Sequence, residues 1–183
     1  MNILITAGPT REAIDPVRFL SNRSTGKMGY ALARAAREAG HTVILVSGPV
    51  ALEPPAGVAV VAVESASDMA CAVKSRAPEA DLVIMAAAVA DYRPRKISPG
   101  KLKKQPGALV LELERTEDIL ASLGHMKRPG QILVGFAADD NAVTLLGRGG
   151  ERVELALQSK MSLAREILAI VTARPGRTVE KSE

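Results

Sequence analysis

Three groups of side chains in this sequence could bind or activate an anionic substrate. The stretch STGK at residues 24–27 lies where a helix is expected to begin, Asp91 follows a run of small residues, and KLKK at residues 101–104 is a compact basic cluster. Backbone N–H groups at a helix N-terminus favour phosphate, and lysine amines neutralise phosphate charge. A carboxylate such as Asp91 accepts hydrogen bonds from hydroxyl groups. Together these residue types indicate phosphate-bearing substrates.

Each group also has an ordinary structural interpretation, and the sequence leaves both open. Ser24 can be a simple N-cap followed by glycines that serve close packing, Asp91 can be a turn aspartate, and KLKK can be a solvated turn. The STGK stretch is not a phosphate-binding loop of the Walker type. That motif needs glycine at position 21 and Ser or Thr after the lysine, whereas Ser21 and Met28 stand there.

The composition narrows the class of partner. The 183 residues carry 24 Lys and Arg against 20 Asp and Glu, giving a net charge of +4. Six of the basic residues lie between Arg93 and Lys104, with no acidic residue among them, so the excess belongs to one segment. A nucleic-acid-binding protein spreads its basic residues over a face and often adds stacking aromatics, yet aromatics make up only 2% here. We therefore expect a local anion site and no nucleic-acid partner.

Further classes are disfavoured by residue counts. One cysteine and two histidines make a disulfide framework or a zinc site improbable. Cys71 lies in a predicted helix, and its side chain is expected to be buried. Neither His41 nor His125 has an evident acidic or nucleophilic partner. No apolar run approaches the roughly 20 residues of a membrane-spanning helix. The first residues lack the basic region of a signal peptide, so we expect a soluble cytoplasmic protein.

Hydrophobic periodicity predicts strands that alternate with helices. Strands are expected at 2–6, 42–46, 58–63, 81–85, 109–113 and 132–136, and helices at 24–39, 67–76, 116–123 and 161–172. Two further strand-like runs, 142–146 and 152–157, flank GRGG and predict a hairpin. The sequence therefore predicts an α/β domain over 1–173, with a Rossmann-like, mostly parallel sheet, flanking helices and a C-terminal antiparallel hairpin extension. Residues 174–183 are expected to form a frayed polar tail.

Ligands of such sheets bind at the carboxyl ends of the strands. This rule selects the loops at 7–23 and 86–104 and the turn after Phe136. A dinucleotide site is disfavoured, because Pro9 follows Gly8 and no acidic residue ends the second strand to bind a ribose.

Taken in order, the segments resemble one known family. The segments ITAGPTREAIDPVRFLSNRSTGKMGYALA, LVSGP, AAAVADYRP, KLKK, TEDIL, VGFAA and DNAVTLL resemble the phosphopantothenate–cysteine ligase domain (phosphopantothenoylcysteine synthetase) of bacterial bifunctional coenzyme A biosynthesis proteins. The resemblance implies a cytoplasmic, homodimeric ligase that joins 4'-phosphopantothenate to L-cysteine through an acyl-cytidylate, using CTP with Mg²⁺. A non-catalytic nucleotide-binding regulatory module is the alternative. The family's usual flavin-dependent decarboxylase domain has no counterpart on this chain, so no flavin is expected, although such a domain could be fused to it or associate with it.

The resemblance also implies roles for individual residues. Lys101 matches the lysine tied to forming the acyl-cytidylate, and Asn22 matches the asparagine tied to handling it. Arg18 matches an arginine that reaches phosphopantothenate across the dimer interface. The other expected phosphopantothenate contacts are Asn22, Ala87, Ala88 and Asp91. The expected nucleotide contacts are Gly8, Ser24, Gly26, Gly29, Asp91, Lys101 and Phe136.

One departure from the family is internal. Ala138 is followed directly by Asp139, where the family has an acidic residue, a helix, another strand and an asparagine-containing loop before DNAVTLL. We therefore expect that a few dozen residues are omitted between Ala138 and Asp139, including basic residues that close over the triphosphate. If their loss is real, nucleotide affinity and catalysis are both in doubt.

Overall fold

The computed structural model describes residues 1–104, 106–136, 143–146, 152–155 and 158–173. Three features expected from the sequence lie outside these residues: the junction between Ala138 and Asp139, the GRGG turn, and the tail at 174–183.

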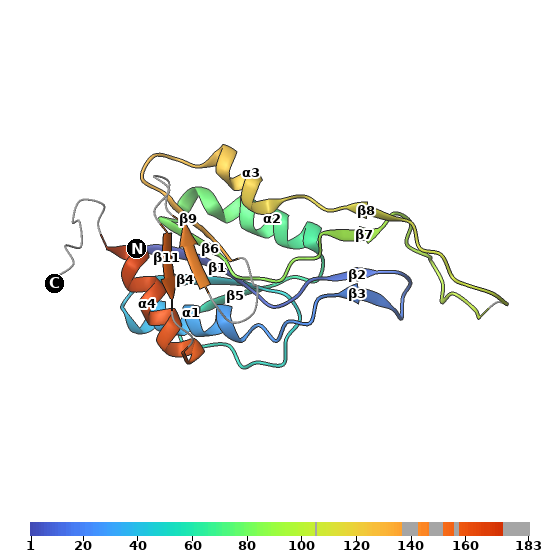
Figure 1. Cartoon of the computed structure of the whole chain (residues 1–183), viewed down its shortest axis with the longest axis horizontal. Helices are drawn as coiled ribbons and strands as arrows, with labels where there is room; N and C mark the ends of the chain where they lie inside the picture. The colour runs from blue at the N-terminus through green and yellow to red at the C-terminus, as the bar shows by residue number, and fades with distance from the viewer. Residues whose placement is uncertain (105, 137–142, 147–151, 156–157, 174–183) are drawn as a thin grey trace.

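A five-stranded parallel sheet forms the centre of the chain (Figure 1). Its strand order is β5-β4-β1-β6-β9. The strands are β1 (Asn2–Ala7), β4 (Thr42–Ser47), β5 (Ala59–Ala62), β6 (Leu82–Met85) and β9 (Ile132–Gly135). The chain winds outward from β1 through β4 and β5, and then returns to the other side of β1 with β6 and β9. The order therefore reverses between β1 and β6, which is where ligands bind in sheets of this kind.

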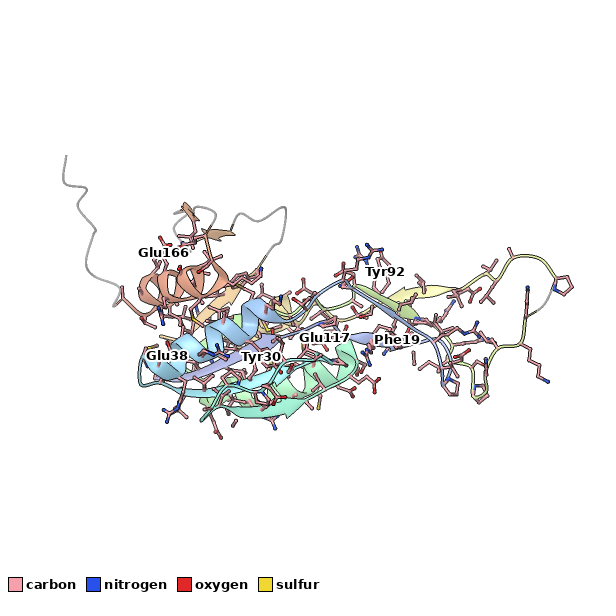
Figure 2. All side chains as sticks on the ribbon, turned by 90° about the horizontal axis from the view of Figure 1, so that it is seen from below. Phe19, Tyr30, Glu38, Tyr92, Glu117 and Glu166 are labelled. Atoms are coloured by element: carbon pink, nitrogen blue, oxygen red, sulfur yellow. The ribbon has the colours of Figure 1, made fainter. Side chains whose placement is uncertain are left out.

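Helices cover both faces of the sheet. They are α1 (Lys27–Glu38), α2 (Ala66–Arg76), α3 (Ile119–Met126) and α4 (Lys160–Thr172), with a short 3-10 turn, η1 (Ala77–Glu79), after α2. Side chains along β1 alternate between the faces, so that Ile3 and Ile5 pack with α1 and α4 while Leu4 packs with α2 and α3. An ion pair between Arg165 and Glu38 (Nη2 to Oε2, 3.0 Å) links α4 to α1. Figure 2 shows the two helices side by side. The apolar runs of the central strands follow from this burial on both faces.

Two antiparallel strand pairs extend away from the sheet, and a long loop joins the two strands of the second pair (Figure 1). We call this projection the arm; it comprises the β2–β3 hairpin and the chain from β7 to β8. Its strands are β2 (Arg11–Ala13), β3 (Phe19–Ser21), β7 (Tyr92–Pro94) and β8 (Leu113–Arg115). A separate antiparallel pair, β10 (Val143–Leu146) with β11 (Arg152–Leu155), follows β9.

The predicted fold class is confirmed, and several local expectations are wrong. The first helix begins at Lys27, not Ser24, because Gly26 adopts a left-handed backbone with φ +73°. The helix expected at 116–123 spans 119–126 because Asp118 caps it, and the strand expected at 109–113 is replaced by β8 at 113–115. The strands β2, β3 and β7 were not expected. Cys71 is exposed on α2 and is not buried. Among the described residues no helix is both long and apolar enough to cross a membrane.

Gly29 allows α1 to approach β1 closely, and its replacement tests this packing. A Cβ at position 29 would lie 2.5 Å from Ala7 Cβ and 2.7 Å from the Thr6 carbonyl oxygen. We predict that Gly29→Ala lowers the free energy of unfolding by about 1–3 kcal/mol, as overpacking does. Urea unfolding measures the change. Gly124→Ala in α3, where nothing lies within 4 Å, is the matched control and should be neutral or slightly stabilising. Equal stability of both variants would contradict the packing role.

Candidate functional site

A cavity of about 1110 Å³ opens at the carboxyl ends of β6 and β9, beside the chain that leads from β1 into α1. Its wall comes from segments far apart in the sequence: the chain that enters α1, the small residues after β6, the start of α3, the end of β9 and the start of α4. The lining residues are 22–28, 85–89, 91, 92, 115–120, 135, 136, 158, 160 and 163. The cavity thus lies between the connections that follow β1 and β6, the two strands between which the strand order reverses.

Two buried threonines fix the floor of the cavity. The hydroxyl of Thr6 accepts a hydrogen bond from the Ala87 backbone N–H (3.1 Å), and that of Thr10 accepts one from the Ala90 N–H (3.0 Å). Both threonines are fully buried. On the other side of the segment, the Thr116 hydroxyl donates to the Ala90 carbonyl oxygen (2.6 Å). The run of small residues after β6 is therefore held from two sides.

Asn22 joins the chain before α1 to this floor. Its Nδ2 donates to the carbonyl oxygens of Ala88 (3.2 Å) and Val89 (3.1 Å). Its Oδ1 accepts no hydrogen bond from the described residues. The amide nitrogen of Asn22 is thus hydrogen-bonded within the protein, and its amide oxygen is a free acceptor at the cavity wall.

The N-terminus of α1 faces the cavity without a side-chain cap. Gly26 is the N-cap, Ser24 Oγ accepts only the Gly26 N–H (3.3 Å), and the first turn holds no acidic residue. The α3 N-terminus beside it is satisfied, because Asp118 accepts the Ala121 N–H (2.9 Å). Unsatisfied N–H groups and the helix dipole give the α1 end of the cavity its preference for anions. Ser24 is therefore not the helix cap.

Basic side chains add to this preference. Arg23, Lys27, Arg115 and Lys160 line the cavity. The neighbouring carboxylate of Glu117 is paired with Lys74 (Nζ to Oε2, 2.7 Å) and also accepts the Ser122 hydroxyl; both contacts lower the pKa of Glu117. The contact with Tyr92, and further the charge of Asp91, raise the pKa of Arg115.

Sequence reasoning did not single out Arg23, Arg115 or Lys160. Arg23 stands directly before the STGK stretch, so its place beside the cavity was available from the sequence. Arg115 and Lys160 enter through β8 and α4, and no local pattern marks them.

The structure brings most of the expected site residues together. Those that line the cavity are Asn22, Ser24, Gly26, Ala87, Ala88, Asp91 and Phe136. Gly8 and Gly29 lie outside the lining and serve packing: a Cβ at Gly8 would meet Val50 Cγ1 at 2.9 Å. The packing interpretation of the glycines that follow Ser24 is thus supported at Gly29.

Arg18 and Lys101 lie on the arm and outside the cavity. Arg18 Nη2 donates to the carbonyl oxygen of Leu102 (2.9 Å), so the KLKK segment lies against the β2–β3 hairpin. Lys101 is exposed there. The expectation that the basic segment lies beside the site is therefore not met within the described chain.

The fold and the cavity define a Rossmann-like α/β domain whose ligand site favours anions. A sequence model of the DNA/pantothenate metabolism flavoprotein C-terminal domain matches residues 1–141. The chain belongs to this family.

The relatives agree with this assignment. The chain is 45% identical, over 217 aligned residues, to the coenzyme A biosynthesis bifunctional protein CoaBC of Bacillus subtilis (strain 168), an alignment that covers 99% of the chain and 53% of that protein. It is 50% identical over 149 residues to CoaBC of Vibrio vulnificus (strain YJ016), covering 80% and 37%. The chain thus spans about half, or less, of the length of these relatives.

Solved structures show the same fold. The crystal structure of the C-terminal domain of CoaBC superposes with a TM-score of 0.81 at 46% identity, covering 93% of each chain. A Cab2 mutant in complex with phosphopantothenate-cysteine has a TM-score of 0.76 at 15% identity, covering 94% of this chain and 85% of that one, and shows the shared fold.

The uncapped helix end can be tested with a simple anion. We predict that Lys27→Ala weakens binding of inorganic triphosphate about threefold to fivefold, because it removes a cation from the first turn of α1 at the cavity wall. Isothermal titration calorimetry measures the affinity. Arg34→Ala, an exposed position on the same helix outside the cavity, is the control and should leave the affinity unchanged. Equal losses in both variants would mean that only overall charge matters.

Proposed function

We propose that this chain is a CTP-dependent ligase that joins 4'-phosphopantothenate to L-cysteine. The observation that carries the proposal is the convergence in one cavity of Asn22, Ser24, Gly26, Ala87, Ala88, Asp91 and Phe136, all implied by the family resemblance to contact the two phosphate-bearing substrates. The 46% identity to the C-terminal domain of CoaBC, over 93% of both chains, supports it.

In the first step the carboxylate of phosphopantothenate attacks the α-phosphorus of CTP. A C–O–P linkage forms, the bond to the β-phosphate breaks, and pyrophosphate leaves. The first turn of α1 and the cations Arg23, Lys27 and Lys160 would hold the triphosphate. Lys101 would neutralise charge that develops at the α-phosphate.

In the second step the cysteine amine attacks the acyl carbon. The amide bond forms, CMP leaves, and the amine loses a proton to solvent. Asn22 would hold the acyl-cytidylate through its unused Oδ1, while Asp91 and the backbone at Ala87 and Ala88 would hold the pantothenate portion. Fixing both reactants in one cavity replaces an encounter in solution by an oriented reaction.

A magnesium ion would accompany the triphosphate. Within the described part of the chain, no three His, Cys, Asp or Glu side chains gather to hold a metal ion. Mg²⁺ commonly binds through one or two carboxylates together with substrate phosphates. Asp91, at the cavity wall, is suited to supply one such carboxylate. When bound, the ion would neutralise negative charge on the triphosphate.

We further propose that a second copy of the chain completes the site. Arg18 and Lys101 lie on the arm, away from their own cavity. The arm also exposes apolar side chains, namely Val17, Phe19, Tyr92, Ile97, Leu109, Val110 and Leu113. An exposed apolar set of this size is typical of an interaction surface, and Figure 2 shows Phe19 on the arm, away from α1 and α4.

We interpret the junction between Ala138 and Asp139 as the place where a segment of a few dozen residues is omitted. The omitted segment would belong to a single ligase domain at 1–173. The family match ends at residue 141, and the Bacillus subtilis alignment spans 217 positions against 183 residues in the chain. Both observations support the interpretation. A chain that truly lacks the segment would bind CTP without turnover, which is the alternative function.

The proposed partner of the domain is a flavin-dependent decarboxylase, fused to it or associated with it, because the relatives are bifunctional proteins about twice the length covered here. The reaction would take place in the cytoplasm.

The ligase is tested by pyrophosphate release from CTP. We expect release only when phosphopantothenate is present, and product only when cysteine is added. ATP in place of CTP tests nucleotide preference. The gene-encoded protein, with any residues between Ala138 and Asp139, is measured beside this chain. Saturable CTP binding without turnover in both proteins would favour the regulatory module over the ligase.

Two variants separate the steps of the same reaction. Lys101→Ala should lower pyrophosphate release by roughly 100-fold or more, because it removes charge stabilisation. Asn22→Asp cannot donate to the carbonyl oxygens of Ala88 and Val89, so it should form acyl-cytidylate while product formation falls by roughly 100-fold. Rapid quench with nucleotide chromatography measures both. Wild-type rates in both variants would overturn the assigned roles.

The dimer is tested in the loop between β7 and β8, where Val110 is 81% exposed. We predict that Leu109→Glu with Val110→Glu weakens self-association at least about tenfold in sedimentation equilibrium, because two apolar side chains would leave the interface. Ile170→Glu, a partly exposed apolar position on α4, is the control and should leave association unchanged. A wild-type chain that stays monomeric at high concentration would contradict the dimer.

A further inference from the structure

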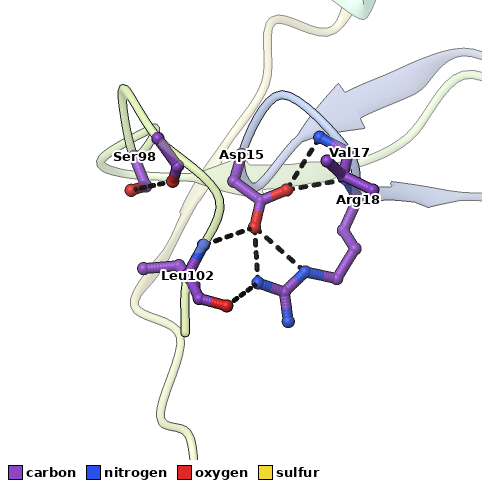
Figure 3. A network of polar contacts seen from close by, with 6 residues as sticks. Asp15, Val17, Arg18, Ser98 and Leu102 are labelled. Atoms are coloured by element: carbon purple, nitrogen blue, oxygen red, sulfur yellow. Dashed lines mark hydrogen bonds and ion pairs between the residues drawn. The ribbon is translucent and has the colours of Figure 1, made fainter. Parts of the chain in front are cut away.

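A buried carboxylate joins the two halves of the arm. Asp15, in the turn between β2 and β3, has a side chain that is fully buried. Its Oδ1 accepts the backbone N–H groups of Val17 (2.9 Å) and Arg18 (2.8 Å). Its Oδ2 accepts Arg18 Nε (3.0 Å) and Nη2, and also the backbone N–H of Leu102 (3.1 Å). Figure 3 shows these contacts.

The contacts fix the backbone beside Lys101. Leu102 gives its N–H to Asp15 and accepts Arg18 Nη2 at its carbonyl oxygen (2.9 Å), so both of its polar backbone groups are held. Four residues earlier, the Ser98 N–H donates to the carbonyl oxygen of Ile14 (3.0 Å). In the described chain from 101 to 111, Leu102 makes the only hydrogen bonds to residues outside that stretch. The position of Lys101 along the arm therefore depends on Asp15 and Arg18.

We propose that Asp15 is a positioning residue for the reaction: it clamps the backbone at Leu102 so that the amine of Lys101 is presented at a fixed place on the arm. The inference rests on the proposed role of Lys101. It holds whether the arm serves its own cavity or that of a second copy, because the clamp lies within one chain.

The electrostatics support a permanent clamp. Hydrogen bonds from Arg18, and then from the backbone of Leu102 and Val17, hold the pKa of Asp15 far below its ordinary value. A depressed carboxyl pKa stabilises the folded arrangement above the ordinary pKa, and this contribution is lost only as the pH falls toward the folded value. The carboxylate is therefore charged, and the clamp closed, at any pH near neutrality.

Asp15→Asn breaks the clamp selectively. The asparagine Oδ1 still accepts the N–H groups of Val17 and Arg18 and so keeps the turn, but Nδ2 meets the N–H of Leu102 donor to donor. Asp81→Asn is the matched control, because Asp81 likewise accepts a backbone N–H (Asn2, 2.8 Å) and an arginine (Arg128, 3.1 Å) but lies outside the cavity and the arm.

The first measurement does not depend on activity. Limited trypsin digestion of the native chain, read by mass spectrometry, reports cleavage after Lys101, Lys103 and Lys104. We expect cleavage at least about tenfold faster in Asp15→Asn and unchanged in Asp81→Asn, because proteolysis follows local opening. Equal cleavage in the wild type and Asp15→Asn would overturn the clamp. If circular dichroism shows that Asp15→Asn is unfolded, Arg18→Lys, which loses the two-pronged contact with Asp15, carries the same digestion test.

The second measurement is pyrophosphate release with saturating phosphopantothenate. We expect Asp15→Asn to lower kcat about tenfold with the KM for CTP within about twofold, and to have no further effect in a Lys101→Ala background. An equal additional loss in that background would show a merely structural role and overturn the inference. A wild-type chain without turnover would contradict the proposed function and the role of Lys101, while the digestion result would still decide whether the clamp exists.

Discussion

The loops that leave β1 and β6 are held to each other by the buried hydroxyls of Thr6 and Thr10, and the rest of the cavity is placed relative to this seam. Backbone N–H groups at this depth need a partner, and leaving one unsatisfied costs about 1–3 kcal/mol. The two hydroxyls supply that partner to Ala87 and Ala90 in the run of small residues after β6. Asn22 then rests on this floor through the carbonyl oxygens of Ala88 and Val89.

The features that favour anions in the cavity and the cations on the arm lie in different parts of the molecule. The features in the cavity are the uncapped N-terminus of α1 and cations on three different elements. The arm carries Arg18 and Lys101 away from that cavity. We propose a second copy because Arg18 and Lys101 do not line the cavity of their own chain.

The central sheet could be predicted because its strands are short apolar runs bounded by turn residues. Such a run is typical of a strand in a parallel sheet that helices cover on both faces. The arm could not be predicted. Its strands are three residues long, and contacts such as Asp15 with Leu102 join positions 87 residues apart. Cys71 was misplaced because Ala70 and Ala72 beside it are small and apolar, which hides the boundary between the two faces of α2. The family resemblance predicted many of the residues that line the cavity, whereas Arg115 and Lys160 were identified only from the structure.

The formation of the acyl-cytidylate is tested most directly by an oxygen label. Phosphopantothenate with ¹⁸O in its carboxylate is converted with CTP and cysteine, and the nucleotide product is analysed by mass spectrometry. Attack of the carboxylate on the α-phosphorus predicts one ¹⁸O atom in CMP and none in pyrophosphate. Label in orthophosphate, or unlabelled CMP together with labelled product, would contradict this chemistry at the site.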